Sequence, residues 1–328
     1  AAATYEVNFG HHVVCDDISN VSRLDLPAAD VVVGGPPCQG FSQLGSRDPE
    51  DPRNHLWREY GKIVAWVKPQ AFVLENVPQF IKSAQFDLLR EWTQPGGILS
   101  DYRLAHGILN AADFGVPQNR KRAIVIGVAH ADASLPTPTH GAGPGLARFE
   151  TVRDAIGDIF NAFRHPGSSV LPDVNYRDGI PGPFKAGQLH LERHPTDLSR
   201  RRYDTVPAGG NRFDLPEDLM PACWANKPTG TTDVMGRLWW DRPSVTIRTE
   251  FYKPEKGRYL HPQYDPDDAT NRVNRPITHW EAARLQTFPD SFAWCGTKIE
   301  IARQIGNAVP PRMASAIARH VGDLLGSL

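Results

Sequence analysis

The stretch VVVGGPPCQGFS, residues 31–42, decides the fold because it joins an apolar strand to a rigid turn that ends on a thiol. Consecutive β-branched residues are typical of a short strand. Two glycines then allow close backbone approach, and two prolines stiffen the turn. In parallel α/β sheets, sites form just beyond the carboxyl ends of strands, and a thiol held there is a candidate nucleophile. The alternative for Cys38 is a buried core cysteine, the usual place of a lone free thiol.

The totals indicate a globular chain of more than one domain. It has 328 residues, 40% of them hydrophobic, and a formal net charge of -1. Because no apolar run approaches the ~20 residues that span a bilayer and no signal peptide is visible, we expect a cytoplasmic protein without membrane contact. Four scattered cysteines argue against a zinc cluster and against a disulfide framework. At this net charge, a nucleic-acid partner requires a local basic patch.

Short apolar runs alternate with helical segments over the first part of the chain, which predicts an α/β fold with a mostly parallel sheet. Helical spacing of apolar residues predicts a helix over 56–67. The predicted strands are HVVCDD (12–17), DVVVGG (30–35), AFVLENV (71–77) and RAIVIGV (122–128).

The character of the chain changes after residue 135, where Pro and Gly become frequent. Helical patterning returns in THWEAARLQ (278–286) and PPRMASAIARHVGDLL (310–325). We therefore predict a catalytic domain, a loop-rich second domain, and a hinge with a return to the first domain, over residues 1–145, 146–275 and 276–328 respectively.

Polar residues stand at the ends of two further predicted strands. LENV (74–77) closes one strand with a Glu-Asn pair, and PQNRKR (117–122) leads into another. A polar strand cap and a solvated edge are the plain alternatives for these segments. Because strand ends converge at one edge of a sheet, the sequence also predicts that the thiol, the carboxylate and the arginines meet there.

Five motifs then carry a resemblance. PPCQGFS, ENV, QNRKR, RPSVTIRT and QIGNAVPP, in this order, resemble the motif set of the DNA cytosine-5 methyltransferases, in particular the bacterial restriction–modification and Dcm-type enzymes. The resemblance covers nearly the whole chain except part of 150–225. It implies a Rossmann-like, S-adenosylmethionine-dependent methyltransferase sheet with a smaller, loop-rich target-recognition domain.

The resemblance also implies a reaction: a methyl group moves from S-adenosylmethionine to C5 of a flipped-out cytosine in duplex DNA. Cys38 takes the role of the thiolate that adds to C6. Glu75 takes that of the acid at N3, and Asn76 that of a positioning residue. Arg122 would stabilise charge near the ring carbonyl, while Arg120 supports the site or a phosphate.

The resemblance assigns two further sets of residues and no metal. Besides DNA, it implies a cognate restriction endonuclease as a partner. The cofactor-lining positions are Asp17, Ile18, Pro37, Leu56, Asn307 and Val309. The expected DNA contacts are Gln39 and Ser42 in the loop after the thiol, and Arg200, Arg201, Arg202 and Arg212 farther along the chain. For these arginines, a solvated basic surface is an equal alternative.

Two family features are absent: the Gly-rich first motif and the acidic residue that holds the ribose. The chain thus starts roughly 40–50 residues into the family pattern, about one strand–helix unit. A truncated record, a split enzyme and a loss of cofactor binding all remain open, and weak S-adenosylmethionine binding is expected of this chain alone. The rival function is a DNA-binding remnant without turnover. An RNA substrate is a smaller alternative, and an unrelated thiol hydrolase is disfavoured.

Overall fold

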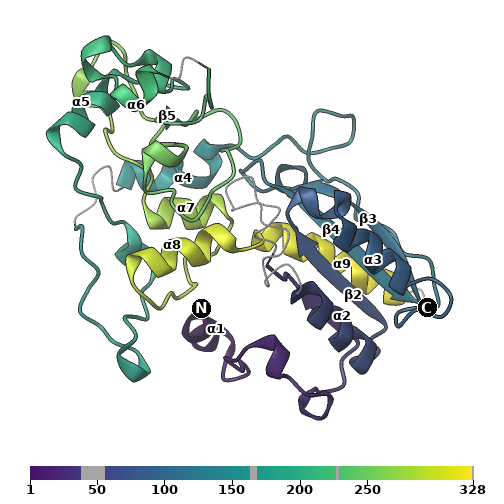
Figure 1. The fold of residues 1–328 in the computed structure, drawn as a ribbon. Helices are drawn as coiled ribbons and strands as arrows, with labels where there is room; N and C mark the ends of the chain where they lie inside the picture. Colours follow the sequence, from purple (N-terminus) through teal and green to yellow (C-terminus); the bar gives the residue numbers. More distant parts are fainter. Residues whose placement is uncertain (38–55, 163–167, 227–228, 327–328) are drawn as a thin grey trace. The chain divides into compact units, whose positions relative to one another are not determined.

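Two compact units make up the chain (Figure 1). The computed structural model describes residues 1–37, 56–162, 168–226 and 229–326. What we call the sheet unit comprises residues 14–114, 121–139 and 313–328. The helix–loop unit comprises residues 1–13, 115–120 and 140–312. Relative to the predicted domains, the start of the chain and residues 276–312 thus fall in the helix–loop unit.

The sheet unit is built on four strands in the order β1-β2-β4-β3. They are β1 (Val31–Gly34), β2 (Ala71–Asn76), β3 (Tyr102–Asn110) and β4 (Lys121–Ala129). β1 and β2 are parallel, whereas β4 is antiparallel to both β2 and β3. The expectation of a mostly parallel sheet is therefore wrong for these strands. β3 and β4 are joined by a short connection, and only antiparallel neighbours can be joined that way.

The strands predicted over 30–35, 71–77 and 122–128 are confirmed, but the one predicted over 12–17 is not. There the chain turns into a short 3₁₀ helix, Ile18–Asn20. The carboxylate of Asp16 accepts a hydrogen bond from the Asp17 backbone N–H, and that of Asp17 accepts one from Ser19. Such local side-chain bonds favour turns over strands.

Helices cover both faces of this sheet (Figure 1). The helix predicted over 56–67 is confirmed as α2 (Leu56–Val67), and α3 (Ala84–Trp92) packs into the same core. That core includes Trp57, Tyr60 and Phe72. α9 (Pro311–Gly326) lies behind the sheet, and its buried residues recur every four positions, as one face of a helix requires: Met313, Ile317 and Val321.

The helix–loop unit has little regular structure. Its helices are α1 (Ala2–Phe9), α4 (Val152–Ala162), α5 (Asp197–Thr205), α6 (Ala222–Ala225), α7 (His279–Leu285) and α8 (Lys298–Asn307). Its two short strands, β5 (Gly236–Arg237) and β6 (Arg258–Leu260), pair in parallel. α4, α7 and α8 share one apolar core. Capping boxes begin both α7 and α8, which explains why the sequence predicts the start of α7 so closely.

Two buried arginines hold the loops of this unit. The side chain of Arg237 is fully buried and donates to the carbonyls of Tyr203, Val206 and His261 at 2.6–2.7 Å. Burial lowers its pKa to about 10. Arg258 donates to the carbonyls of Gly209 and Gly210, both at 2.8 Å, and to that of Arg237. These arginines satisfy backbone acceptors that a longer sheet would otherwise pair.

Candidate active site

Polar side chains gather where β1 and β2 end and β4 begins. In the parallel pair, Gly34 lies opposite Leu74, so both strands end at the same edge of the sheet. In the antiparallel pair, Asn76 lies opposite Ala123, so β4 starts at this edge. Glu75, Asn76 and Arg122 are therefore neighbours, as the sequence predicts for strand ends.

Glu75 and Arg122 form an ion pair at this edge. The Arg122 Nε atom lies 2.8 Å from a Glu75 carboxylate oxygen, and the two side chains are 15% and 19% exposed. Arg122 also donates to the carbonyl of Lys121. Burial lowers the pKa of Arg122, and Glu75 opposes that shift, so the guanidinium keeps its charge. The site thus holds a fixed cation and a carboxylate side by side while leaving part of each open.

Asn76 fixes the turn that follows β1. Its side-chain amide donates to the carbonyl of Pro36 at 3.1 Å, and its oxygen accepts from the backbone N–H of Val77. Pro36 stands two positions before Cys38. Cys38 itself, with Gln39 and Ser42, lies outside the described residues.

At the end of β1, Gly34 and Gly35 each lie close to a different neighbour. A Cβ on Gly34 would lie 2.4 Å from the ring of Tyr60, whose hydroxyl donates to the carbonyl of Val73 at 2.8 Å. A Cβ on Gly35 would lie 3.3 Å from the Glu75 carboxylate. The turn therefore leaves no room for a side chain at Gly34 beside α2, and only a tight fit at Gly35 beside the acid.

Arg120 lies in the helix–loop unit and is buried there, with 1% of its surface exposed. It donates to the carbonyl of Ile247 at 3.0 Å and to that of Gly306 at 2.8 Å. Nearby, the buried Gln118 amide accepts from the backbone N–H of Ile247 and donates to the carbonyl of Leu285. One buried hydrogen-bond network thus joins four segments of the chain: QNRKR (118–122), SVTI (244–247), RLQ (284–286) and QIGN (304–307).

Comparison with known proteins now fixes the family. The model of the C-5 cytosine-specific DNA methylases matches residues 1–181 and 185–323. The chain belongs to the C-5 cytosine-specific DNA methylase family. Type II methyltransferase M1.HphI of Haemophilus parahaemolyticus is 33% identical over 97% of this chain and 77% of its own length. M.XorII of Xanthomonas oryzae pv. oryzae is 34% identical over 94% of this chain and 72% of its own. The methylase is thus related to enzymes of restriction–modification systems.

Solved structures agree on the fold. A putative DNA modification methyltransferase encoded within an Escherichia coli prophage superposes with a TM-score of 0.65 at 25% identity, over 99% of this chain and 90% of that one. The Dnmt2 methyltransferase of S. pombe gives 0.57 at 19% identity, over 99% and 88%, which supports the fold alone. The methylase therefore has the α/β fold of S-adenosylmethionine-dependent C5 methyltransferases.

The residues predicted to line the cofactor site of the methylase divide between the two units. In the sheet unit, Asp17 is exposed, and its Oδ1 accepts from the amide and hydroxyl of Ser19, which lowers its pKa. Ile18 is half-buried in a short helix that contacts α2, the helix that Leu56 begins. Pro37 is exposed after β1. The remaining two, Asn307 at the end of α8 and Val309 just beyond it, belong to the helix–loop unit.

The arginines predicted to contact DNA differ in their exposure and in their hydrogen-bond and ion-pair partners. Arg200 and Arg201 are exposed on α5, and Arg201 forms a 3.2 Å ion pair with the equally exposed Asp218. The Arg202 side chain donates to the carbonyl of Leu219 at 2.8 Å. Arg212 is only 4% exposed and lies over the ring of Phe213, so its guanidinium supports the loop from inside.

No metal site was predicted for the methylase, and no group of three or more possible metal ligands occurs within the described ranges. No helix in those ranges is long and apolar enough to cross a membrane. Sequence reasoning missed the roles of Gln118, Arg237 and Arg258. Gln118 stands inside the quoted motif QNRKR as its first letter, which was the one available signal.

Proposed function

We propose that this chain transfers the methyl group of S-adenosylmethionine to C5 of a flipped-out cytosine in duplex DNA through a covalent Cys38 adduct. The observation that carries the proposal is the Glu75–Arg122 pair, held at the strand edge where the turn to Cys38 begins. Family membership supports the reaction class.

The first step needs a nucleophile, because C5 of cytosine is unreactive until a group adds at C6. The Cys38 thiolate forms a bond to C6, and the electron pair of the C5–C6 double bond becomes available at C5. Asn76 anchors the Pro36 carbonyl, which limits how far the turn before Cys38 can move.

The second step manages charge on the ring. Negative charge develops at N3 and O2 as the thiolate adds, and Glu75, protonated when the bound ring excludes water beside it, donates a hydrogen bond or its proton to N3. The Arg122 guanidinium lies 2.8 Å from that acid and can interact with a ring oxygen beside it. Once C5 has taken the methyl group, loss of the C5 proton to a base expels the Cys38 thiolate and restores the double bond.

S-adenosylmethionine supplies an electrophilic methyl group when bound. The Oδ2 atom of Asp17 remains an available acceptor, because the Ser19 bonds use Oδ1, and it suits the exocyclic amine of adenine. The half-buried side chains of Ile18 and Leu56 suit the flat faces of the ring. Pro37, Asn307 and Val309 complete the proposed set.

Exposed cations on α5 suit the negatively charged DNA strand. Arg200 and Arg201 are the exposed members of the predicted set, whereas Arg202 donates to the carbonyl of Leu219 and Arg212 is buried over the ring of Phe213. A restriction endonuclease that cuts the same sequence is the proposed partner in the cell.

Methyl transfer from radiolabelled S-adenosylmethionine to duplex DNA tests this proposal. The native chain should label DNA, and Cys38→Ser should reduce labelling to background while binding DNA with unchanged affinity. Cys223→Ser, at an exposed cysteine of the helix–loop unit, is the matched control and should label DNA at the native rate. Labelling by Cys38→Ser at the native rate would overturn the assignment of the nucleophile.

A further inference from the structure

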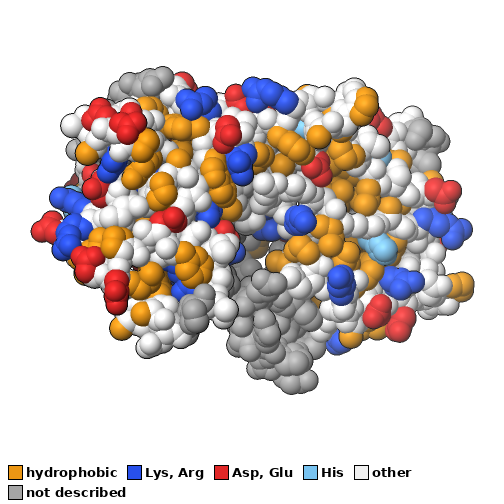
Figure 2. Space-filling view, turned by 90° about the horizontal axis from the view of Figure 1, so that it is seen from above, with side chains coloured by type: hydrophobic (Ala, Val, Ile, Leu, Met, Phe, Trp, Pro, Cys, Tyr) orange, Lys and Arg blue, Asp and Glu red, His pale blue; other side chains and the backbone are white. Residues whose placement is uncertain are grey.

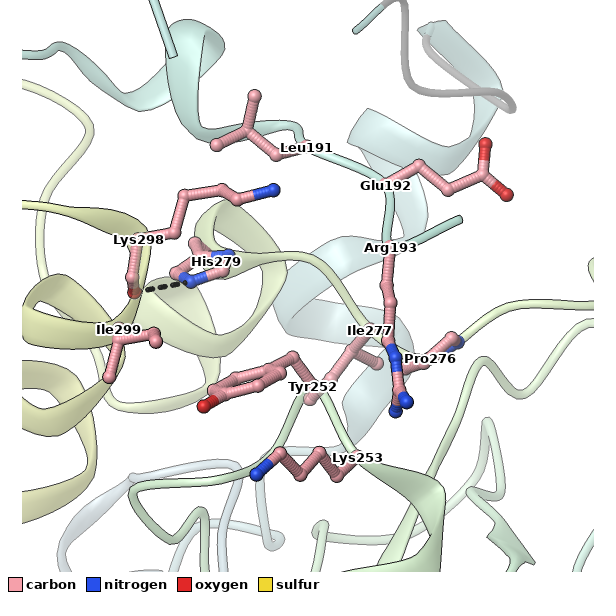
Figure 3. Close-up of a pocket in the computed structure, with 10 residues that line it drawn as sticks. All are labelled: Leu191, Glu192, Arg193, Tyr252, Lys253, Pro276, Ile277, His279, Lys298 and Ile299. Carbon is pink, nitrogen blue, oxygen red and sulfur yellow. Dashed lines mark hydrogen bonds between the residues drawn. The ribbon is translucent and has the colours of Figure 1, made fainter. Parts of the chain in front are cut away.

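A pocket in the helix–loop unit is separate from every residue assigned above (Figure 3). Its volume is about 210 Å³. Four segments far apart in the sequence line it, at residues 191–193, 252–253, 276–279 and 298–299. A pocket lined by four segments forms only when this unit is folded.

The inner surface of the pocket is apolar. Leu191, Pro276 and Ile277 are buried along it. The ring of Tyr252 lies nearly parallel to that of His279, with an angle of 11° between the rings and 6.0 Å between their centres. The His279 Nε2–H donates to the carbonyl of Lys298 at 2.9 Å, shown dashed in Figure 3. Burial lowers the pKa of His279 to about 4, so the imidazole is neutral at pH 7.

Cations surround this apolar surface. Arg193 and Lys253 come from two of the lining segments, and Lys298 from a third. Arg193 shares its charge with Glu255 at 3.3 Å, and Lys253 pairs with Glu250. In Figure 3 the carboxylate of Glu192, the one acid that lines the pocket, points away from the other labelled side chains.

Lys298 stands out among these cations. Its ammonium donates to the neutral carbonyl of Ser169, so that partner does not cancel its charge. It is also the first residue of α8, where the helix dipole is positive. A cation at this end of a helix is unfavourable, because the helix dipole repels it. The positive charge therefore has no stabilising role within α8, and it adds to the positive field of the helix end.

We propose that this pocket binds one sugar–phosphate unit of the DNA backbone, distinct from the nucleotide that is methylated. The phosphate lies against Lys298, Arg193 adds positive charge on the other side of the pocket, and the deoxyribose packs on the ring of Tyr252. The small volume suits a phosphate with its sugar, so the contact orients DNA without reading bases. The inference rests on the proposed function for its choice of DNA as the source of the phosphate.

Charge on the face drawn in Figure 2 agrees with a localised contact. On the face in Figure 2, Lys and Arg side chains are interspersed with Asp and Glu, and form no continuous cationic field among the coloured atoms. DNA binding by such a surface depends on particular phosphate pockets more than on overall charge.

The salt dependence of DNA affinity tests the pocket. For one phosphate contact, the slope of log K against log salt changes by about 0.9. Lys298→Ala should reduce the slope by that amount and weaken specific and non-specific duplexes by the same factor, about three- to tenfold at 0.15 M salt, while Lys298→Arg should keep the native slope. Arg303→Ala removes the same charge from an exposed position of α8 outside the pocket, and should leave the slope unchanged.

Three outcomes would overturn the proposal. Equal slopes for Lys298→Ala and the native chain would remove the contact, and equal losses in Lys298→Ala and Arg303→Ala would reduce it to general electrostatics. Calorimetry with thymidine 5′-monophosphate covers the other source: Lys298-dependent binding of this nucleotide with unchanged DNA affinity would assign the pocket to free nucleotides. If the native chain binds no DNA at all, the proposed function fails first, and that result is separate from these three.

Discussion

The strand-edge site and the loops of the helix–loop unit both depend on arginines, but these arginines do opposite things. Arg122 pairs with Glu75 at a partly open edge, where we propose that its charge acts on the reacting ring. Arg237 and Arg258 are buried and bind backbone carbonyls. The difference shows that a region with two short strands can use side-chain donors where a sheet would use its own backbone. Substitutions can therefore disrupt the proposed catalytic site and the folded loops separately.

Glu75→Gln gives the largest expected loss of activity. The amide keeps a hydrogen-bond acceptor for Arg122 but holds no transferable proton, so kcat should fall about 10²–10⁴-fold with the fold intact. Single-turnover methylation and circular dichroism together measure this. Glu59→Gln, at the Lys62 ion pair on α2, is the matched control and should turn over normally. An unchanged kcat in Glu75→Gln would remove Glu75 from the mechanism.

Arg237→Met should lower the stability of the protein, whereas Glu75→Gln should lower its catalytic rate. It leaves several buried carbonyls without donors, so the free energy of unfolding should fall by about 3–5 kcal/mol. Urea denaturation measures the change. Arg242→Met alters an exposed arginine, 59% exposed at the side chain, and should stay within ~0.5 kcal/mol. Equal midpoints for the two variants would show that Arg237 does not hold the loops.

Acid should destabilise the helix–loop unit through its buried histidines. Burial lowers the pKa of His261 to about 3 and that of His279 to about 4, whereas an unfolded histidine titrates near 6.5. Below pH 6.5 the unfolded chain therefore binds protons that the folded chain does not. The free energy of unfolding has its full value above pH 6.5. It falls as the pH drops below that, by up to about 1.4 kcal/mol per pH unit for each histidine.

Denaturation at several pH values between 6.5 and 5 measures this slope. His279→Gln should remove about half of it, while His194→Gln, at an exposed position, should leave it unchanged. Glu281 does not interfere in this window: although its burial raises the pKa, Arg275 holds it down to about 2. A native slope in His279→Gln would mean that His279 already takes up a proton when folded.

Gly34→Ala should give the smallest of these effects. Its Cβ would meet the Tyr60 ring at 2.4 Å, so overpacking should cost about 1–3 kcal/mol in thermal or urea unfolding. Gly322→Ala is the same substitution at an exposed site in α9 with nothing within 4 Å, and should instead stabilise by about 0.5–1 kcal/mol. A loss of the same size in both variants would contradict the role of Tyr60.

The sequence predicted the parts of the molecule that depend on local pattern. The apolar runs around β1, β2 and β4 place Glu75, Asn76 and Arg122 at strand ends, and the structure brings these three together. Residue type and order along the chain were sufficient, since the meeting of strand ends at one sheet edge follows from short-range rules.

The rest depends on contacts between distant segments. Nothing around Arg237 distinguishes it from an exposed arginine, because its carbonyl partners lie 31 and 34 positions earlier in the chain and 24 positions later. Arg212 was predicted to contact DNA from its place in a basic stretch, with a solvated surface as an equal alternative, and the fold of distant segments leaves it only 4% exposed. The strand expected over 12–17 failed because the side chains of Asp16 and Asp17 bind the nearby backbone.

Trapping with duplex DNA that carries 5-fluorocytosine tests the central claim most directly. Fluorine at C5 cannot leave as a proton does, so an enzyme that has added its thiolate to C6 and transferred methyl remains bound to the DNA. With S-adenosylmethionine present, we predict a heat-stable protein–DNA band that is absent in Cys38→Ser. Intact DNA binding with no such band, under conditions where an established C5 methyltransferase is trapped, would contradict the account and support a DNA-binding protein without turnover.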